Sequence, residues 1–486
     1  MRTTTPTTPD PAEAAVPGDA PGTDRWFLST APVVSALVHL CVPMAAAMIV
    51  GAVDNVINAG FIGSLHDDAL LAAVTLGSPV LALVMAIGNV FGVGGGALVS
   101  RLLGASAHDA GRAADIRRVS AFALWGTAVV GVVVGAAGLL LLDPLVALLG
   151  ADRAAQHATT TFVGILLAFV PVLAAAVCLE QLVRAEGAAR QVMVGLIAST
   201  IANVAFDALF ILGLHLGVAG AALAVGLANL VTVGYFATWL TRNSAQLSLA
   251  PRWFTLAPSV LRPVLGVGVG TLLQSAFLVV TALVLNNLAA GYGDGPLAAM
   301  GVAVRIAQVP EFLVMGVTLG VLPLLAYAYG RGDRERLAAA LRTSAVAVGG
   351  VAILFSAVVF LFRDTVLAAF LTDRSVLALG VTVLAAQLTA MIANGFTGLI
   401  TSLFQATGQA LAATVMSVTQ GVLFVPVVLL GDLWFGLPGI IWALTATEVA
   451  VLGAGAVLLL TTRRAIDRGI AAGSPARAEE ALAAAA

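Results

Sequence analysis

The chain has 486 residues, of which 60% are hydrophobic and only 10% are charged, and its net charge is −2. This balance excludes a soluble globular protein, which needs more polar surface, and offers no basic face for nucleic acid. It indicates a polytopic membrane protein with enough apolar sequence for about a dozen helices of roughly 20 residues each.

Both ends of the chain lack this apolar character. Residues 1–30 contain many Thr, Pro, Ala and Asp without the basic-then-apolar order of a signal peptide, so we expect a disordered tail. Residues 465–486 are Ala-rich with mixed charge and are expected to form a second disordered tail. Cys41 and Cys178 lie in apolar runs, which argues against a disulfide or a cysteine-based metal site.

Twelve apolar segments between the tails are predicted to be membrane-spanning helices. All 23 basic residues are arginines, and most of them follow even-numbered segments. By the positive-inside rule this places both termini in the cytoplasm, and the even number of spans agrees. The predicted spans are 33–57, 68–95, 119–142, 160–182, 192–214, 217–240, 259–288, 297–325, 343–362, 376–402, 411–431 and 436–461.

The first and last six segments resemble one another. Arg184–Gly187 after the fourth segment corresponds to Gln405–Gly408 after the tenth, and Gly220–Ala222 corresponds to Gly439–Ile441. Six helices return the chain to the same side of the membrane, so the two repeats are parallel. We therefore expect an all-α protein with two six-helix lobes. The N-lobe would comprise residues 31–242, the cytoplasmic linker 243–262 and the C-lobe 263–464.

The fifth predicted helix carries an acid at membrane depth. Asp207 would cost about 2.5–3.5 kcal/mol to insert there, so it marks a functional site by default. Asn203 lies four residues earlier and shares its helix face. The alternative is that Asn203 and Asp207 form a structural hydrogen-bonded pair that joins helices.

The first predicted helix carries three residues of interest. Asp54 is a candidate functional acid, or else a solvated residue near the outer interface. Asn58 shares its face and is a candidate ligand or an interhelical hydrogen-bond donor. Pro43 predicts a kink, which either moves during function or is static. In the second helix, glycines 92, 94, 95 and 96 favour close helix packing over a phosphate loop.

The second repeat has a different polar set. Asn203 and Asp207 align with Phe424 and Val428, so the pair has no counterpart there. Glu311 and Arg305 are ionisable residues of the eighth helix, and their six-residue spacing disfavours a pair on one face. Each is a candidate for substrate or proton handling, or for pairing with another helix. Further cavity candidates, which packing would also explain, are Gln274, Gln308, Gln387, Asn394, Met315 and Phe277.

Five short motifs occur in a specific order. They are R-A-x-G, N-x-x-x-D-x-x-F-I, G-x-x-G-A-A, P-x-x-x-Y-x-Y-G and F-Q-A-x-G, at Arg184–Gly187, Asn203–Ile211, Gly217–Ala222, Pro323–Gly330 and Phe404–Gly408. Each is weak alone, but together they resemble the MATE (multidrug and toxic compound extrusion) family, in particular its DinF-like prokaryotic branch. The resemblance covers about residues 30–460.

The resemblance implies an exporter with a V-shaped central cavity that exchanges protons or sodium for amphipathic compounds by alternating access. It also implies a cation site at Asn203, Asp207 and an acid of the first helix. The family's position for that acid is Asn58 here, and Asp54 lies one turn earlier. Val225 replaces a threonine that helps to bind sodium in some relatives. Because oxygen ligands are fewer, we favour protons over sodium, which would otherwise bind at Asp207 and Asn203.

These inferences together predict a monomeric, multi-pass transporter of a bacterial plasma membrane rather than an enzyme. Its coupling ion would be H⁺ or Na⁺, with no cofactor, and its substrate an amphipathic, cationic small molecule. The alternative is a flippase of related fold for a lipid-linked or amphipathic metabolite. A flippase of that kind is expected to line its cavity with several arginines, whereas only Arg305 lies at membrane depth. The five histidines are scattered, which argues against a membrane enzyme.

Overall fold

The computed structural model describes residues 20–473 except 65–67, 108, 151–154 and 369–373. In this part of the chain the ordered elements are all helical. Twelve helices are long and apolar enough to cross a membrane, which confirms the predicted number and order of spans. The elements are α1 (Asp24–Ser29), α2 (Val33–Ser64), α3 (Asp68–Ala105), η1 (Ala110–Arg112), α4 (Ala113–Leu140), α5 (Leu142–Leu148), α6 (Gln156–Ala185), α7 (Ala189–Asp207), η2 (Ala208–Gly213), α8 (Gly217–Asn243), η3 (Pro251–Trp253), α9 (Pro258–Ala290), α10 (Asp294–Arg331), α11 (Arg334–Leu361), α12 (Arg363–Ala368), α13 (Arg374–Thr407), α14 (Ala410–Phe435) and α15 (Leu437–Gly473).

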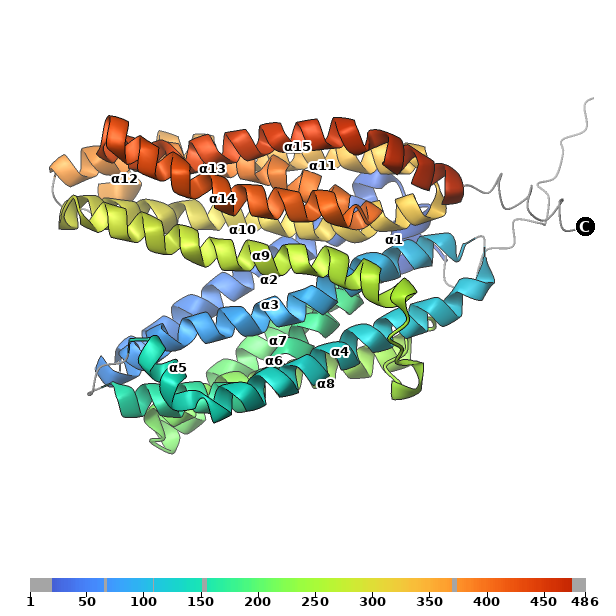
Figure 1. Ribbon diagram of the computed structural model, residues 1–486, viewed down its shortest axis with the longest axis horizontal. Helices are drawn as coiled ribbons and strands as arrows, with labels where there is room; N and C mark the ends of the chain where they lie inside the picture. Colours follow the sequence, from blue (N-terminus) through green and yellow to red (C-terminus); the bar gives the residue numbers. More distant parts are fainter. Residues whose placement is uncertain (1–19, 65–67, 108, 151–154, 369–373, 474–486) are drawn as a thin grey trace, which may run out of the picture.

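The long helices form two bundles. Helices α2, α3, α4, α6, α7 and α8 pack together in the N-lobe, and α9, α10, α11, α13, α14 and α15 in the C-lobe. Figure 1 shows the bundles converging at the end where α1 and the C-terminal part of α15 lie, and diverging toward the end that carries α5 and α12. We call the first the closed end and the second the open end. The result is the V-shaped arrangement expected of the fold.

Several boundaries differ from those predicted. Residues 24–29, assigned to a disordered tail, form α1, and residues 465–473, assigned to the other tail, extend α15. Residues 1–19 and 474–486 of the predicted tails lie outside the described residues. Hydropathy locates the apolar part of a helix, but the helix continues past that part wherever its polar turns pack on other chain segments.

The lobes meet along closely packed glycines. Gly94 of α3 lies against the backbone of Val264 in α9, and Gly268 of α9 lies against Val90 in α3. Neither glycine has room for a Cβ atom. This reciprocal contact confirms that the glycine run of the second predicted helix serves close packing.

Helix α1 contacts both lobes at the closed end. The Arg336 guanidinium of α11 donates hydrogen bonds to three carbonyl oxygens at the end of α1, those of Phe27, Leu28 and Ala31, at 2.8–2.9 Å. On the N-lobe side, His39 Nε2 lies 2.9 Å from Asp24 Oδ1. Because the carbonyls of the last helical turn have no donor within the helix, this arginine caps α1 and fixes it to the C-lobe.

Candidate functional site

The N-lobe brings together the four predicted coupling residues. Asp54 and Asn58 lie on α2, and Asn203 and Asp207 lie on α7, which packs against α2. Asp207 is 3% exposed and Asn203 is 5% exposed. The Asn58 amide donates a hydrogen bond to Asp54 Oδ2 at 3.4 Å, and the charges of Asp54 and Asp207 interact. The structure therefore makes one site of residues that the sequence placed on two helices.

Thr200 is a member of this site that the sequence analysis missed. Its side chain interacts with the Asp54 carboxylate from one turn before Asn203 on α7. Thr200, Asn203 and Asp207 are spaced by three and four residues, so they share one helix face. That spacing was a usable signal, but a threonine in an apolar helix more often bonds its own backbone.

Two polar atoms of this site lack hydrogen-bond partners among the described residues. Asp54 Oδ1 and Asn203 Oδ1 are buried and accept no hydrogen bond from the described residues. A buried polar atom without a partner costs about 1–3 kcal/mol, so such atoms are rare unless they serve a ligand. Two carboxylates and an amide oxygen suit a proton or a small cation, because either one compensates negative charge.

The helix changes type directly after Asp207. Ala208–Gly213 form a π-helix, in which the Leu214 amide donates to the Leu209 carbonyl oxygen at 2.8 Å. His215 follows with a φ of 55°, a left-handed conformation. Single π-turns occur frequently at functional sites, because the wider turn shifts the register of the side chains before it relative to those after it. Asp207 therefore sits at a break in α7 rather than inside a regular helix.

Pro43 lies where α2 touches the C-lobe. Its neighbours Cys41 and Ala45 contact Gly320 and Gly316 of α10, and Cys41 Sγ lies 3.6 Å from the carbonyl oxygen of Val317. Proline removes one hydrogen bond from the helix and weakens it locally. A change in the α2 kink would therefore act directly on the contact between the lobes, although the conformational role of Pro43 stays a prediction.

The predicted substrate-cavity residues of the C-lobe differ in exposure and surroundings. Arg305 and Glu311 are exposed and do not pair with each other. Phe277 packs against Gly421 of α14. Gln274, Gln308 and Met315 are exposed, whereas Gln387 and Asn394 are partly buried.

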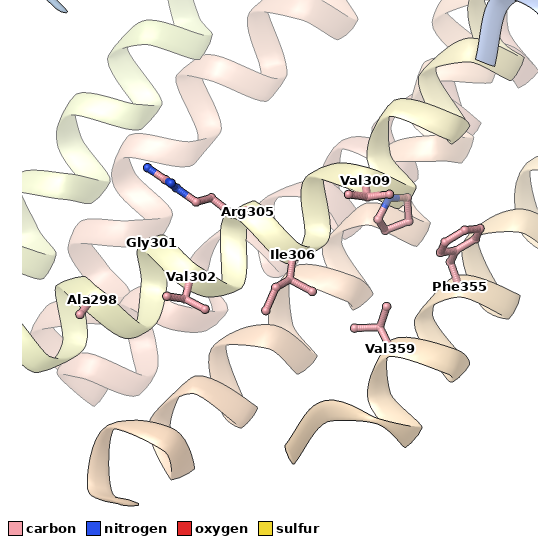
Figure 2. Close-up of a pocket in the computed structure, with 9 residues that line it drawn as sticks. Ala298, Gly301, Val302, Arg305, Ile306, Val309, Phe355 and Val359 are labelled. Atoms are coloured by element: carbon pink, nitrogen blue, oxygen red, sulfur yellow. The ribbon is translucent and has the colours of Figure 1, made fainter. Parts of the chain in front are cut away.

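One pocket of about 740 Å³ lies between α10 and α11. Figure 2 shows Ile306 of α10 and, across the pocket from it, Phe355 and Val359 of α11. The Arg305 side chain points from α10 to the side away from α11. Arg305 is the only predicted cavity residue that lines it. Arg305 also shares a helix face with Gly316, which contacts α2 closer to the closed end. That face therefore turns toward the gap between the lobes.

Glu448 of α15 is a second residue that the sequence analysis missed. Its side chain is 3% exposed, and the Gln420 amide of α14 donates a hydrogen bond to Glu448 Oε1 at 2.6 Å. The rule that singled out Asp207 applies equally here, since Glu448 is an acid inside the last predicted span, 436–461.

Comparison with known proteins agrees with this architecture. The MatE family profile matches residues 43–209 and 270–430. The multidrug export protein MepA of Staphylococcus aureus (strain MRSA252) is 31% identical over 444 residues, covering 91% of this chain and 97% of that protein. MepA of Staphylococcus saprophyticus is 30% identical over 445 residues, with the same coverage.

A solved structure shares the fold. It is an outward-facing multidrug resistance MATE family transporter of the MOP superfamily, with a TM-score of 0.82, 22% identity and coverage of 92% of this chain and 98% of that chain. The narrower assignment to the DinF-like branch stays a prediction. By its matching profile, its full-length relatives and its twelve-helix architecture, the chain belongs to the MATE family of multidrug exporters.

Proposed function

We propose that this protein is a proton-coupled antiporter that exports amphipathic, cationic compounds from a bacterial cell. The observation that carries the proposal is the site shared by the buried Asp207 and the half-buried Asp54, whose charges interact. Among the described residues, no cationic group acts on either carboxylate. The name of the MepA relatives, multidrug export protein, supports the export of several drugs.

Orientation follows from the arginines. The closed end carries the arginine-rich segments after the even-numbered spans, so we place it in the cytoplasm together with both termini. The open end then faces outward, and the structure corresponds to a state that admits protons and releases substrate on the outer side.

Protonation supplies the conformational signal in this mechanism. Two carboxylates that share a low-dielectric site repel each other, and a proton on one of them removes that repulsion. The packing of α2 against α7 then changes, and α2 transmits the change through the Pro43 segment to Gly316 and Gly320 of α10. The lobes then separate at the cytoplasmic end, where the proton leaves and substrate enters.

The donor set favours protons over sodium. Sodium takes several oxygen ligands, whereas Val225 offers none at the position where some relatives carry a threonine. Thr200 adds one hydroxyl to the site, so sodium binding at Asp54, Thr200, Asn203 and Asp207 is the alternative.

Everted membrane vesicles separate the two coupling ions. We expect an acid-inside gradient, imposed without sodium, to drive uptake of a cationic dye, and a sodium gradient at constant pH to drive none. The reverse result would assign sodium as the coupling ion. Failure of both gradients would contradict antiport.

The flippase alternative is tested in the same vesicles. A flippase lined by several arginines would move an anionic, lipid-linked substrate. Arg305 is the only charged residue that lines the described pocket, so we expect no movement of a fluorescent, phosphate-linked lipid in parallel with dye uptake. Lipid movement without dye uptake would favour the flippase.

A further inference from the structure

A second pocket, of about 330 Å³, lies at the closed end of the C-lobe, apart from the proposed coupling site. Helices α11 and α15 form its two walls, and α13, which packs against both, contributes Leu403 between them. Figure 1 shows the C-terminal part of α15 at this end of the molecule. Among the described residues the lining is apolar except for Arg334, Arg463 and Asp467.

Each wall of this pocket combines leucines with one arginine. On α11, Leu337 and Leu341 follow Arg334 by three and seven residues, so the three share one helix face. On α15, Leu459 precedes Arg463 by four residues and shares its face in the same way. Because α11 begins at the closed end and α15 runs toward it, both arginines lie nearer that end than the leucines do.

The pocket lies at the boundary between the hydrocarbon core and the headgroup layer. Leu460 and Arg463 are 23 and 26 residues from Leu437, where α15 begins, which corresponds to about 35 and 39 Å along the helix. A bilayer has a hydrocarbon core about 30 Å thick and is about 40–45 Å thick with its headgroups. Leu460 ends the apolar run of α15 and is 72% exposed, so this mouth of the pocket faces lipid chains.

The polar rim of the pocket carries more positive than negative charge. An Nη of Arg334 lies 3.2 Å from Asp467 Oδ1, and Arg463 Nε lies 3.9 Å from Asp467 Oδ2, so one carboxylate serves two guanidinium groups. The arginine side chains are 64% and 69% exposed, so these ion pairs are weak. Each guanidinium has five N–H donors, and most of them stay available to an anion.

The headgroup decides which lipid such a pocket prefers. An acyl chain gains little when it leaves the bilayer for an apolar groove, because both surroundings are apolar. Arginine binds phosphate through parallel, charge-assisted hydrogen bonds, and basic pockets at the membrane surface favour lipids with a net negative charge.

We propose that this pocket binds one anionic phospholipid from the leaflet at the closed end. An acyl chain lies along the leucines between α11 and α15, and the phosphate lies between Arg334 and Arg463, where it competes with Asp467 for their donors. The bound lipid joins the two walls, which otherwise meet through α13 and the exposed Arg334–Asp467 pair. It therefore stabilises the C-lobe at this end.

A structural role for Asp467 predicts the opposite response to one substitution. If Asp467 only holds α11 to α15, Asp467→Asn should loosen the pocket and weaken lipid binding. If Asp467 competes with the phosphate, the same substitution frees both arginines and removes a negative charge from the rim, so lipid binding should become stronger.

Native mass spectrometry of delipidated, full-length protein in detergent measures binding as phosphatidylglycerol or phosphatidylcholine with identical acyl chains is added. We expect one phosphatidylglycerol to bind at least fivefold more tightly than phosphatidylcholine. R463Q should weaken phosphatidylglycerol binding about fivefold, D467N should strengthen it, and R118Q, which removes an exposed, ion-paired arginine of α4, should leave it unchanged. Equal affinity for the two lipids, unchanged binding in R463Q or weaker binding in D467N would overturn the proposal.

Two further measurements distinguish the pocket from a basic surface. A338F fills the pocket without changing its charge and should weaken phosphatidylglycerol binding as much as R463Q does, whereas A456F at an exposed position of α15 should not. Glycerol 3-phosphate, which carries the phosphate without acyl chains, should not displace the lipid at equal concentration. Full binding in A338F, or displacement by glycerol 3-phosphate, would contradict a lipid site in this pocket.

Discussion

Asp54 of α2 and Asp207 of α7 lie close enough for their negative charges to interact, although they come from opposite ends of the N-lobe sequence. The Asn58 amide donates a hydrogen bond to Asp54. We therefore expect Asp54, rather than Asn58, to act as the functional acid of the first membrane helix. A lone carboxylate on α7 would be compensated by one proton without any change in helix packing, whereas a pair on two helices couples its charge state to their separation.

The first prediction concerns which residue of α2 carries the proton. Asp54→Asn should lower pH-driven export at least tenfold, because one of the two interacting carboxylates is lost. Asn58→Ala removes a long hydrogen bond of 3.4 Å, worth about 0.5 kcal/mol, and should lower export about twofold. Initial rates of dye uptake in everted vesicles provide the measurement. A severe loss in N58A with normal activity in D54N would assign the role to Asn58.

The second prediction concerns the glycine contact between the lobes. Gly94→Ala places a methyl group against the Val264 backbone, and overpacking of this kind costs about 1–3 kcal/mol. The closed end should therefore open more often. Alkylation of Cys41, which is buried where α2 meets α10, reports this opening, and we expect roughly fivefold or faster labelling.

The matched control is Gly234→Ala in α8, where the space around a Cβ is open. Cys178, buried inside the N-lobe, is replaced by alanine in both proteins so that only one thiol reacts. Equal labelling of the two variants would show that the glycine contact does not hold the lobes together.

The third prediction concerns the attachment of α1. Arg336→Ala removes three hydrogen bonds to the carbonyls that end α1, each with a charged donor and worth about 1.5–3 kcal/mol at most. We expect a clear fall in the apparent Tm in detergent. Arg334→Ala, the control two residues away, breaks an exposed pair with Asp467 worth no more than about 1 kcal/mol. A smaller effect for R336A than for R334A would show that α1 is not anchored by Arg336.

The fourth prediction concerns pH and Glu186, which lies in the turn after α6. Burial raises the pKa of Glu186 to about 7, and a hydrogen bond from Ser244 opposes that rise. Because the folded protein binds this proton more tightly than the unfolded chain, the contribution of Glu186 to stability is greatest at low pH. It is lost as the pH rises from about 4.5, the ordinary value, to about 7.

Thermal unfolding between pH 5 and pH 8 measures this contribution. The difference in apparent Tm between wild type and Glu186→Gln should change across that range, with wild type losing more stability at the higher pH. A constant difference between the two proteins would show that Glu186 does not titrate in the folded state.

The number and order of the helices were predictable because each span is a long apolar run, and the repeat followed from short motifs around Gly187 and Gly408. Helix α1 was not predictable. Its six residues contain a single apolar run, Trp26–Leu28, which is too short to show a helical period, and what stabilises them is Arg336, more than 300 residues later in the chain. No local pattern contains such a contact, since helices this short are not stable alone.

The candidate site was predictable in part for a similar reason. Asp207 and Asn203 stand out because an acid inside an apolar helix is costly. The nearness of Asp54 to Asp207 depends on how α2 packs against α7, which spacing within one helix does not determine. Thr200 and Glu448 carried usable signals, but only their partners, Asp54 and Gln420, distinguish them from ordinary helix contacts.

Transport by purified Asp207→Asn in proteoliposomes tests the coupling claim most directly. The measurement compares uptake of a cationic dye driven by a pH gradient with exchange of labelled for unlabelled dye at equal pH. We predict that wild type performs both, whereas D207N loses pH-driven uptake at least tenfold and retains exchange, because substrate still binds while the proton no longer does. In D207N, uptake driven by the pH gradient at the wild-type rate would contradict the account.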